Sequence, residues 1–209
     1  MKMGGIKMKV EDIFNDLPVL ETSRTILRKI EKNDVQDIYS YCSDPEVSKY
    51  TTWYPHMKIE DTENFIDFII DKYNKSQISP WGIQDKTTGR IIGTCDFVGW
   101  DTNHHKAEIG YALSRDYWGQ GYMTECVKKI IEFGFEKMDL VRIEARCIPA
   151  NTGSSRVMEK SGMEFEGICR KQVFIKGKFK DLKMYSIINE NSAKIFEDNY
   201  SIQHHNKSN

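Results

Sequence analysis

The spacing of apolar residues changes twice between residues 106 and 148, and this change restricts the possible folds more than any other feature. Residues 106–114 alternate like a strand, residues 123–138 repeat apolar side chains at helical spacing, and residues 141–148 alternate again. A strand, a helix and a second strand in succession need a crossover that leaves the strands parallel. The sequence therefore predicts a sheet that contains a parallel pair.

Strands separated by short polar turns flank this unit and indicate antiparallel pairing. The other expected elements are, in chain order, a strand at 24–29, helices at 31–43 and 62–73, strands at 81–84 and 91–100, a helix at 154–161 and a hairpin over 170–188. Thr62 is the expected cap of its helix, Gly162 ends the 154–161 helix, and the hairpin turns at Lys176-Gly177. We predict an α+β fold with a mixed, mostly antiparallel sheet flanked by helices.

The 209 residues show no central change in composition, so one domain is expected. We predict an N-terminal extension over residues 1–20, with a short amphipathic helix packed outside the domain. The folded domain is expected over 21–190. A polar tail without regular structure is expected over 191–209.

The charge balance and the apolar content of the chain limit the classes of partner that it is expected to bind. Thirty Lys and Arg residues are nearly balanced by thirty-one Asp and Glu residues, so the chain has no strong basic charge. We therefore expect neither nucleic acid nor a membrane as a partner. The apolar runs are too short for a membrane span, and the N-terminus lacks a signal-peptide core. These features favour a cytoplasmic location. We expect a monomer or a homodimer, and the sequence does not distinguish the two. The five cysteines are widely spaced, and His104-His105 lies in a polar turn, so no metal site is expected.

The segment Gly119-Gln120-Gly121 lies between a predicted strand and a predicted helix. Unpaired amides at a helix start, together with the helix dipole, favour an anion there, and glycine lets a phosphate approach the backbone. A tight turn without a ligand is the alternative. A Walker loop is excluded because Tyr122 follows Gly121, and a dinucleotide fingerprint because Thr124 stands where the third glycine belongs.

Two segments carry a resemblance to a known family. Residues 107–125, AEIGYALSRDYWGQGYMTE, closely resemble the cofactor-binding segment of GNAT-type N-acetyltransferases. Residues 151–163, NTGSSRVMEKSGM, resemble the second signature of that superfamily. Both look most like the branch that acetylates ribosomal-protein N-termini, the Rim-type enzymes. The resemblance covers residues 21–189 and implies the GNAT-like acyl-CoA N-acyltransferase fold.

The resemblance implies that acetyl-CoA is the co-substrate and lies between the strands at 106–114 and 141–148. Main-chain groups would hold its pantetheine arm at Tyr111, Ala112 and Leu113. Backbone amides would bind its pyrophosphate at Trp118, Gly119, Gln120, Gly121, Tyr122, Met123 and Thr124. Asn151 would serve the pantetheine or thioester region, with a turn-forming asparagine as the alternative.

Catalytic groups are less well marked. Ser154 matches a serine that Rim-type enzymes place near the thiolate leaving group, although it could simply begin a helix. Glu108 is our first choice of general base, with a solvated strand residue as the alternative interpretation. Asp96 and Tyr185 are the further candidates.

Three positions depart from the family pattern. Asp116 stands where the superfamily motif has glutamine or arginine. Met158 replaces a tyrosine that many relatives use as a proton donor, and Val173 replaces a glutamate of some Rim-type enzymes. The tyrosine's role as proton donor is therefore not carried over to Met158, and Val173 leaves the base of the Rim-type enzymes unassigned in this chain.

The resemblance favours transfer of an acetyl group from acetyl-CoA to the α-amino group of a protein or peptide. A small-molecule amine or polyamine is the alternative acceptor, and a non-catalytic acyl-CoA-binding module is a hypothesis of another class. Arg170 and Lys171 would favour an acidic partner. Aromatic residues that could line an acceptor groove are Trp53, Tyr54, Trp81, Phe174 and Phe179.

Overall fold

A computed structural model describes residues 9–205 and contains one eight-stranded sheet in the order β1-β2-β3-β4-β5-β6-β8-β7. Its strands are β1 (Leu20–Glu21), β2 (Thr25–Arg28), β3 (Trp81–Asp85), β4 (Ile91–Asp101), β5 (Lys106–Leu113), β6 (Arg142–Cys147), β7 (Glu164–Ile175) and β8 (Lys178–Ile188). Strands β5 and β6 are parallel, and the other neighbours are antiparallel. The predicted mixed sheet and its parallel crossover are confirmed.

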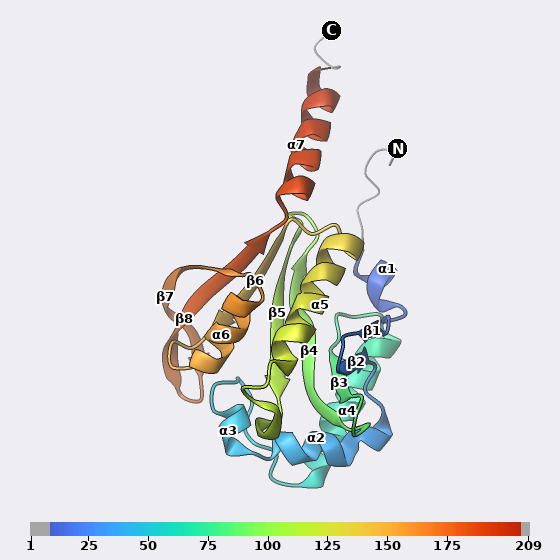
Figure 1. The fold of residues 1–209 in the computed structure, drawn as a ribbon, viewed down its shortest axis with the longest axis vertical. Helices are drawn as coiled ribbons and strands as arrows, with labels where there is room; N and C mark the ends of the chain where they lie inside the picture. Colours follow the sequence, from blue (N-terminus) through green and yellow to red (C-terminus); the bar gives the residue numbers. More distant parts are fainter. Residues whose placement is uncertain (1–8, 206–209) are drawn as a thin grey trace.

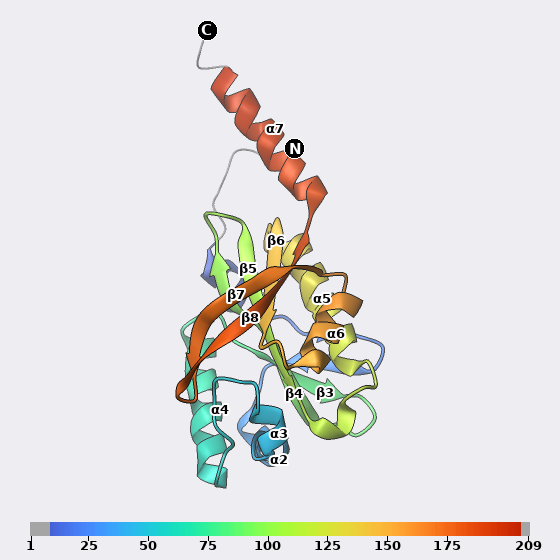
Figure 2. The same cartoon turned by 90° about the vertical axis from the view of Figure 1, so that its left-hand side faces the viewer.

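Helices cover both faces of the sheet (Figure 1). They are α1 (Val10–Phe14), α2 (Val35–Cys42), α3 (Pro45–Ser48), α4 (Ile59–Asn74), α5 (Tyr122–Lys137), α6 (Thr152–Lys160) and α7 (Glu190–His205), with short 3-10 turns at Lys32–Asp34 and Arg115–Tyr117. Figure 2 shows α5 and α6 on one side of the sheet and α4 on the other. The two faces of the central strands therefore have different surroundings.

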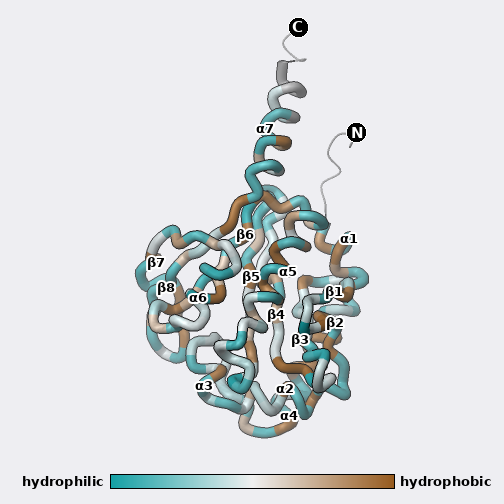
Figure 3. The backbone as a smooth tube through the Cα atoms, viewed as in Figure 1, coloured by the Kyte–Doolittle hydropathy of each residue, from teal (hydrophilic) through white to brown (hydrophobic). Residues whose placement is uncertain are grey.

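Helix α5 packs closely on the central strands. A Cβ added to Gly134 would lie 2.9 Å from Ile143 of β6 and 3.1 Å from Phe97 of β4, so glycine permits this close approach. Figure 3 shows hydrophobic residues on the central strands and on α5, whereas most of α7 is hydrophilic. Phe14 of α1 is buried against Trp81, so the segment before β1 contributes to the same core.

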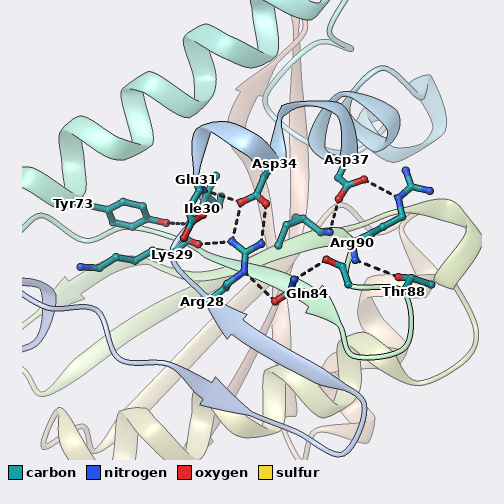
Figure 4. Close-up of polar contacts among 12 residues, drawn as sticks. Arg28, Lys29, Ile30, Glu31, Asp34, Asp37, Tyr73, Gln84, Thr88 and Arg90 are labelled. Carbon is teal, nitrogen blue, oxygen red and sulfur yellow. Dashed lines mark hydrogen bonds and ion pairs between the residues drawn. The ribbon is translucent and has the colours of Figure 1, made fainter.

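A polar network fixes α2 over the sheet (Figure 4). Arg28 of β2 donates to both carboxylate oxygens of Asp34, at 2.9 and 2.8 Å, just before α2 begins. Asp37 of α2 accepts from Arg90 at 2.7 Å and from the N–H of Ile91 at 3.0 Å. Bidentate and charge-assisted bonds of this kind hold orientation as well as position. The network therefore anchors α2 beside β4.

The structure differs from the sequence-based expectations at one helix start, in two short elements and in the C-terminal helix. Helix α4 begins at Ile59, and Thr62 is buried inside it instead of capping it. Strand β1 and helix α3 were not expected, and α7 forms where a tail without regular structure is predicted. The predicted hairpin turn at residues 176–177 is confirmed, because both residues have positive φ, as a two-residue hairpin turn requires. Within residues 9–205 there is no helix with the length and apolar character of a membrane span.

Candidate active site

Strands β5 and β6 separate partway along their length. Their parallel pairing runs from Lys106 with Arg142 to Ile109 with Ala145, and β5 continues for four residues beyond the last pair. Strand β6 pairs with β8 as far as Cys147. The sheet therefore opens into a splay beyond Ile109, between two strands that remain fixed on their outer sides.

The main chain of β5 turns polar groups into this splay. The N–H of Ser114 donates to the carbonyl of Ile92, a residue of β4, at 2.7 Å. In an antiparallel strand the N–H and C=O of one residue point to the same neighbouring strand, and the direction alternates from residue to residue. The main-chain groups of Ala112 therefore point to β4, whereas those of Tyr111 and Leu113 point into the splay. Both residues lie beyond Ile109 and Ala145, the last pair of the β5–β6 ladder, so their N–H groups face the opening between the strands. Such groups gain free energy from a ligand that can accept their hydrogen bonds.

The loop at the end of β5 forms an amide cradle, which we define as the backbone of residues 119–124. Gly119 and Gly121 have φ values of +72° and +85°, a conformation that favours glycine. The first hydrogen bond of α5 runs from the N–H of Glu125 to the carbonyl of Gly121 at 3.1 Å. Within the described chain, the amides of the cradle have no acceptor. Their position at the N-terminus of a 16-residue helix favours an anion.

Two side chains brace the loop. The indole Nε1 of Trp118 donates to the carbonyl of Leu113 at 2.8 Å, and Nε2 of Gln120 donates to the carbonyl of Asp116 at 2.7 Å. The carbonyl of Leu113 is therefore occupied, while its N–H still faces the splay. Trp118 and Gln120 shape the cradle through these bonds in addition to their own backbone amides.

Ser154 lies across the splay from β5. Its Oγ is 2.9 Å from the hydroxyl of Tyr111, and Oδ1 of Asn151 accepts the N–H of Ser154 at 3.2 Å as the cap of α6. Burial raises the pKa of the Tyr111 hydroxyl, while its bond to Ser154 opposes that shift. The phenol therefore stays protonated at neutral pH. The sequence analysis predicted a role for the main-chain groups of Tyr111 and did not identify its hydroxyl as part of the site.

Glu108 is engaged in an ion pair. Its Oε1 accepts from Nε of Arg146 on β6 at 2.7 Å, and its Oε2 accepts from Nη2 of the same guanidinium. Both carboxylate oxygens are thus bound to one guanidinium in a bidentate arrangement. A proton acceptor at Glu108 would have to compete with this ion pair.

Asp96 offers a different carboxylate at the same place. It is paired with Gly110, one residue beyond the last β5–β6 pair, and a Cβ on Gly110 would lie 3.3 Å from Oδ1 of Asp96. Phe97 contacts α5, so Asp96 faces the opposite side of the sheet. Burial raises the pKa of Asp96 to about 7, and the charge of Lys72 on α4 opposes the shift. A carboxyl with this pKa is suited to accept a proton at neutral pH.

The remaining candidates have other surroundings. Tyr185 is buried and its hydroxyl donates to Glu159 at 3.0 Å. Met158 is buried at the position of the family's tyrosine, so it serves packing there. Trp81 is fully buried, with its indole bonded to the carbonyl of Pro18 at 2.7 Å, and cannot line an acceptor groove. That expectation was wrong.

Exposed aromatic residues gather at the tip of the β7–β8 hairpin. Phe174 and Phe179 form a cross-strand pair with ring centroids 5.0 Å apart, and both are exposed. Nζ of Lys176, at the turn, donates to the carbonyl of Ser48 at 2.6 Å and lies 5.3 Å from the ring of Tyr54. The hairpin tip thus meets the segment between α3 and α4. The described residues contain no group of three His, Cys, Asp or Glu that could hold a metal ion.

Comparisons with known proteins agree with this geometry. The acetyltransferase (GNAT) domain family matches residues 24–164. The uncharacterized N-acetyltransferase p20 of Bacillus licheniformis is 36% identical over 177 residues, which cover 85% of this chain and 99% of that protein. A GNAT-family acetyltransferase structure from Bacillus anthracis has 31% identity and a TM-score of 0.73, and the match covers 83% of this chain and 99% of that one.

A further solved structure is the ribosomal-protein-S5-alanine acetyltransferase from Vibrio fischeri. It shares 25% identity with this chain at a TM-score of 0.70, and the match covers 82% of this chain and 97% of that one. The family match extends over more than half of the chain and includes the splay and the amide cradle. The chain therefore belongs to the GNAT family of acetyltransferases and is an acetyl-CoA-dependent N-acetyltransferase.

Proposed function

We propose that this enzyme transfers the acetyl group of acetyl-CoA to the α-amino group of a protein or peptide. The observation that carries the proposal is the splay beyond Ile109, which ends at the amide cradle. The acceptor class draws support from the Vibrio fischeri relative, whose name assigns it a ribosomal protein as substrate. The exposed aromatic residues of the β7–β8 hairpin are suited to contact a polypeptide.

The cofactor-binding groups follow from the directions of the backbone. The N–H groups of Tyr111 and Leu113 are available to the amide-containing pantetheine arm, and the amide cradle is available to the pyrophosphate. Asn151 uses Oδ1 to cap α6, which leaves its side-chain amide as a donor toward the thioester region. The residues present therefore fit the co-substrate at both its charged and its uncharged parts.

The proton acceptor and the proton donor of the reaction lie on opposite faces of the sheet. Acetyl-CoA supplies the acetyl thioester. On the face opposite α5, Asp96 accepts a proton from the attacking amine, directly or through a water, as the new C–N bond forms. On the other side, the Tyr111–Ser154 hydroxyl pair donates a proton to the sulfur as the C–S bond breaks. A thiol has an ordinary pKa near 8.5, so a weak donor is sufficient for this leaving group.

This assignment replaces Glu108 as the base and adds Tyr111 to Ser154 as a donor. Glu108 would first have to leave Arg146, at the cost of an uncompensated guanidinium. Asp96 needs no such rearrangement, because the pKa of about 7 already leaves half of the carboxyl groups ionised near neutral pH. The ion pair of Glu108 is then a structural tie between β5 and β6 just before they separate.

A transfer assay tests the proposal. The enzyme is incubated with acetyl-CoA and with peptides bearing a free α-amino group, and thiol release is followed together with the mass of the peptide. Matched peptides with a blocked N-terminus but a free lysine, and polyamines such as spermidine, serve as competing acceptors. Turnover confined to free α-amino groups supports the proposal.

The other outcomes are equally informative. Faster turnover of a polyamine than of any peptide would overturn the acceptor class. Binding of acetyl-CoA without transfer to any acceptor would favour a non-catalytic acyl-CoA-binding module. A protein that binds neither CoA nor acetyl-CoA would contradict the cofactor site itself.

A further inference from the structure

Arg24, immediately before β2, reaches the amide cradle from a distant part of the chain. Its Nε donates to Oε1 of Glu125 at 2.8 Å, and its Nη2 lies 2.6 Å from the same oxygen. The same Nη2 donates to the carbonyl of Gln120 at 3.0 Å. The guanidinium also lies over the ring of Tyr122, 4.0 Å from its centroid. One side chain thus contacts both the loop and the first turn of α5.

The bond to Gln120 fixes the orientation of one peptide group in the cradle. In a trans peptide, the carbonyl of one residue and the N–H of the next point in opposite directions. Holding the carbonyl of Gln120 on Arg24 therefore directs the N–H of Gly121 away from Arg24. Gly121 has φ +85°, and without the anchor its glycine backbone could readily adopt other conformations.

Glu125 gives Arg24 its own support. The carboxylate lies in the first turn of α5, where it accepts from Arg24 and, at 2.8 Å, from the hydroxyl of Ser23. An unpaired carboxylate at this helix start would repel an incoming phosphate, and the guanidinium offsets that charge. Nη1 of Arg24 has no partner in the described chain, and 38% of the side chain is exposed.

We propose that Arg24 is a positioning residue for acetyl-CoA, which acts by holding the Gln120 carbonyl so that the Gly121 amide faces the pyrophosphate. The inference rests on the proposed cofactor site and adds to it a residue that lies immediately before β2. It predicts that Arg24 matters for the nucleotide end of the donor and not for the acetyl end. Arginine suits this position because its planar fork reaches Glu125 and Gln120 together, which a lysine ammonium cannot do in the same geometry.

Two acetyl donors separate this role from general stability. Acetyl-CoA carries the pyrophosphate, whereas acetyl-pantetheine ends before it. Arg24→Met should raise KM for acetyl-CoA at least tenfold, because a charge-assisted anchor is lost, with kcat within about threefold of the parent enzyme. With acetyl-pantetheine, kcat/KM should stay the same as in the parent. Arg24→Lys, a milder change, should raise KM for acetyl-CoA in the same direction.

The double variant Arg24→Met/Glu125→Gln distinguishes position from charge. It removes the guanidinium and the carboxylate together, so the local charge balance is restored while the Gln120 carbonyl stays unheld. KM for acetyl-CoA should remain at least fivefold raised. A return to the parent KM would overturn the positioning role, as would equal losses with both donors. A parent enzyme that uses neither donor would instead contradict the proposed function.

Discussion

Replacement of Asp96 by asparagine gives the sharpest test of the proton chemistry. The variant keeps the size of the side chain and removes the proton acceptor, so kcat/KM at pH 8 should fall by roughly 10²- to 10⁴-fold. Burial raises the pKa of Asp96 to about 7. The ionised fraction of such a group is about one tenth at pH 6 and about nine tenths at pH 8. The parent enzyme should therefore gain about tenfold in rate from this group between pH 6 and pH 8.

The acceptor amine also titrates in this range, so the assay compares enzymes instead of reading one profile. Dividing kcat/KM of the parent by that of Asp96→Asn at each pH removes the contribution of the acceptor. This ratio should rise about tenfold from pH 6 to pH 8. Glu108→Gln is the matched control, because it alters a carboxylate on the same face that is bound to Arg146. A flat ratio, or a pH dependence lost in Glu108→Gln, would refute the assignment.

The same pKa has a consequence for stability. The folded protein holds the Asp96 proton at pH values where the unfolded chain, with an ordinary pKa of 3.8, has released it. Between these two pKa values the folded state binds more protons than the unfolded state. The stability that Asp96 contributes is therefore fully present below about pH 4 and is lost as the pH rises to about 7. Urea denaturation of the parent and of Asp96→Asn should show the variant gaining relative stability as the pH rises over this range.

Three further predictions concern the amide cradle, the proton-donating Tyr111–Ser154 hydroxyl pair and the hydrophobic core. Gly121→Val should weaken CoA binding at least tenfold in calorimetric titration, whereas Gly89→Val, which strains another positive φ in open space, should leave it unchanged. Tyr111→Phe should lower kcat by roughly tenfold or more in the transfer assay, because Ser154 loses its hydroxyl partner. In urea denaturation, Tyr73→Phe should lower the free energy of unfolding by about 1–3 kcal/mol, because the Tyr73 hydroxyl bonds two backbone groups. Tyr41→Phe is the control and should leave the free energy of unfolding unchanged, because the buried Tyr41 hydroxyl has no hydrogen-bond partner among the described residues.

Much of the fold could be predicted because its long elements have clear periods. The change from strand to helix spacing and back between residues 106 and 148 was sufficient to predict the parallel β5–β6 pair. Strand β1 has two residues and α3 has four, too few for a period to be visible. Helix α7 is predominantly polar, and its composition resembles that of a disordered tail.

The proposed cofactor-binding residues could be named from the sequence for a different reason. The proposed phosphate site consists of backbone amides, so glycines and a helix start at fixed spacing indicate its place in one short segment. The proposed catalytic groups meet across the fold instead. Tyr111 and Ser154 are 43 residues apart in the chain, and Glu108 and Arg146 are 38 apart. No local pattern indicates that Glu108 pairs with an arginine while Asp96 lies half-buried on the side of the sheet that α4 covers.

The most direct test of the central claim is a crystal structure of the protein with CoA bound. The pyrophosphate should lie within hydrogen-bonding distance of amides in residues 119–124, and the pantetheine arm should run between β5 and β6 beside Tyr111 and Leu113. The sulfur should lie near the Tyr111–Ser154 hydroxyl pair. Density for CoA at another surface, with the splay closed or filled by side chains, would contradict the account.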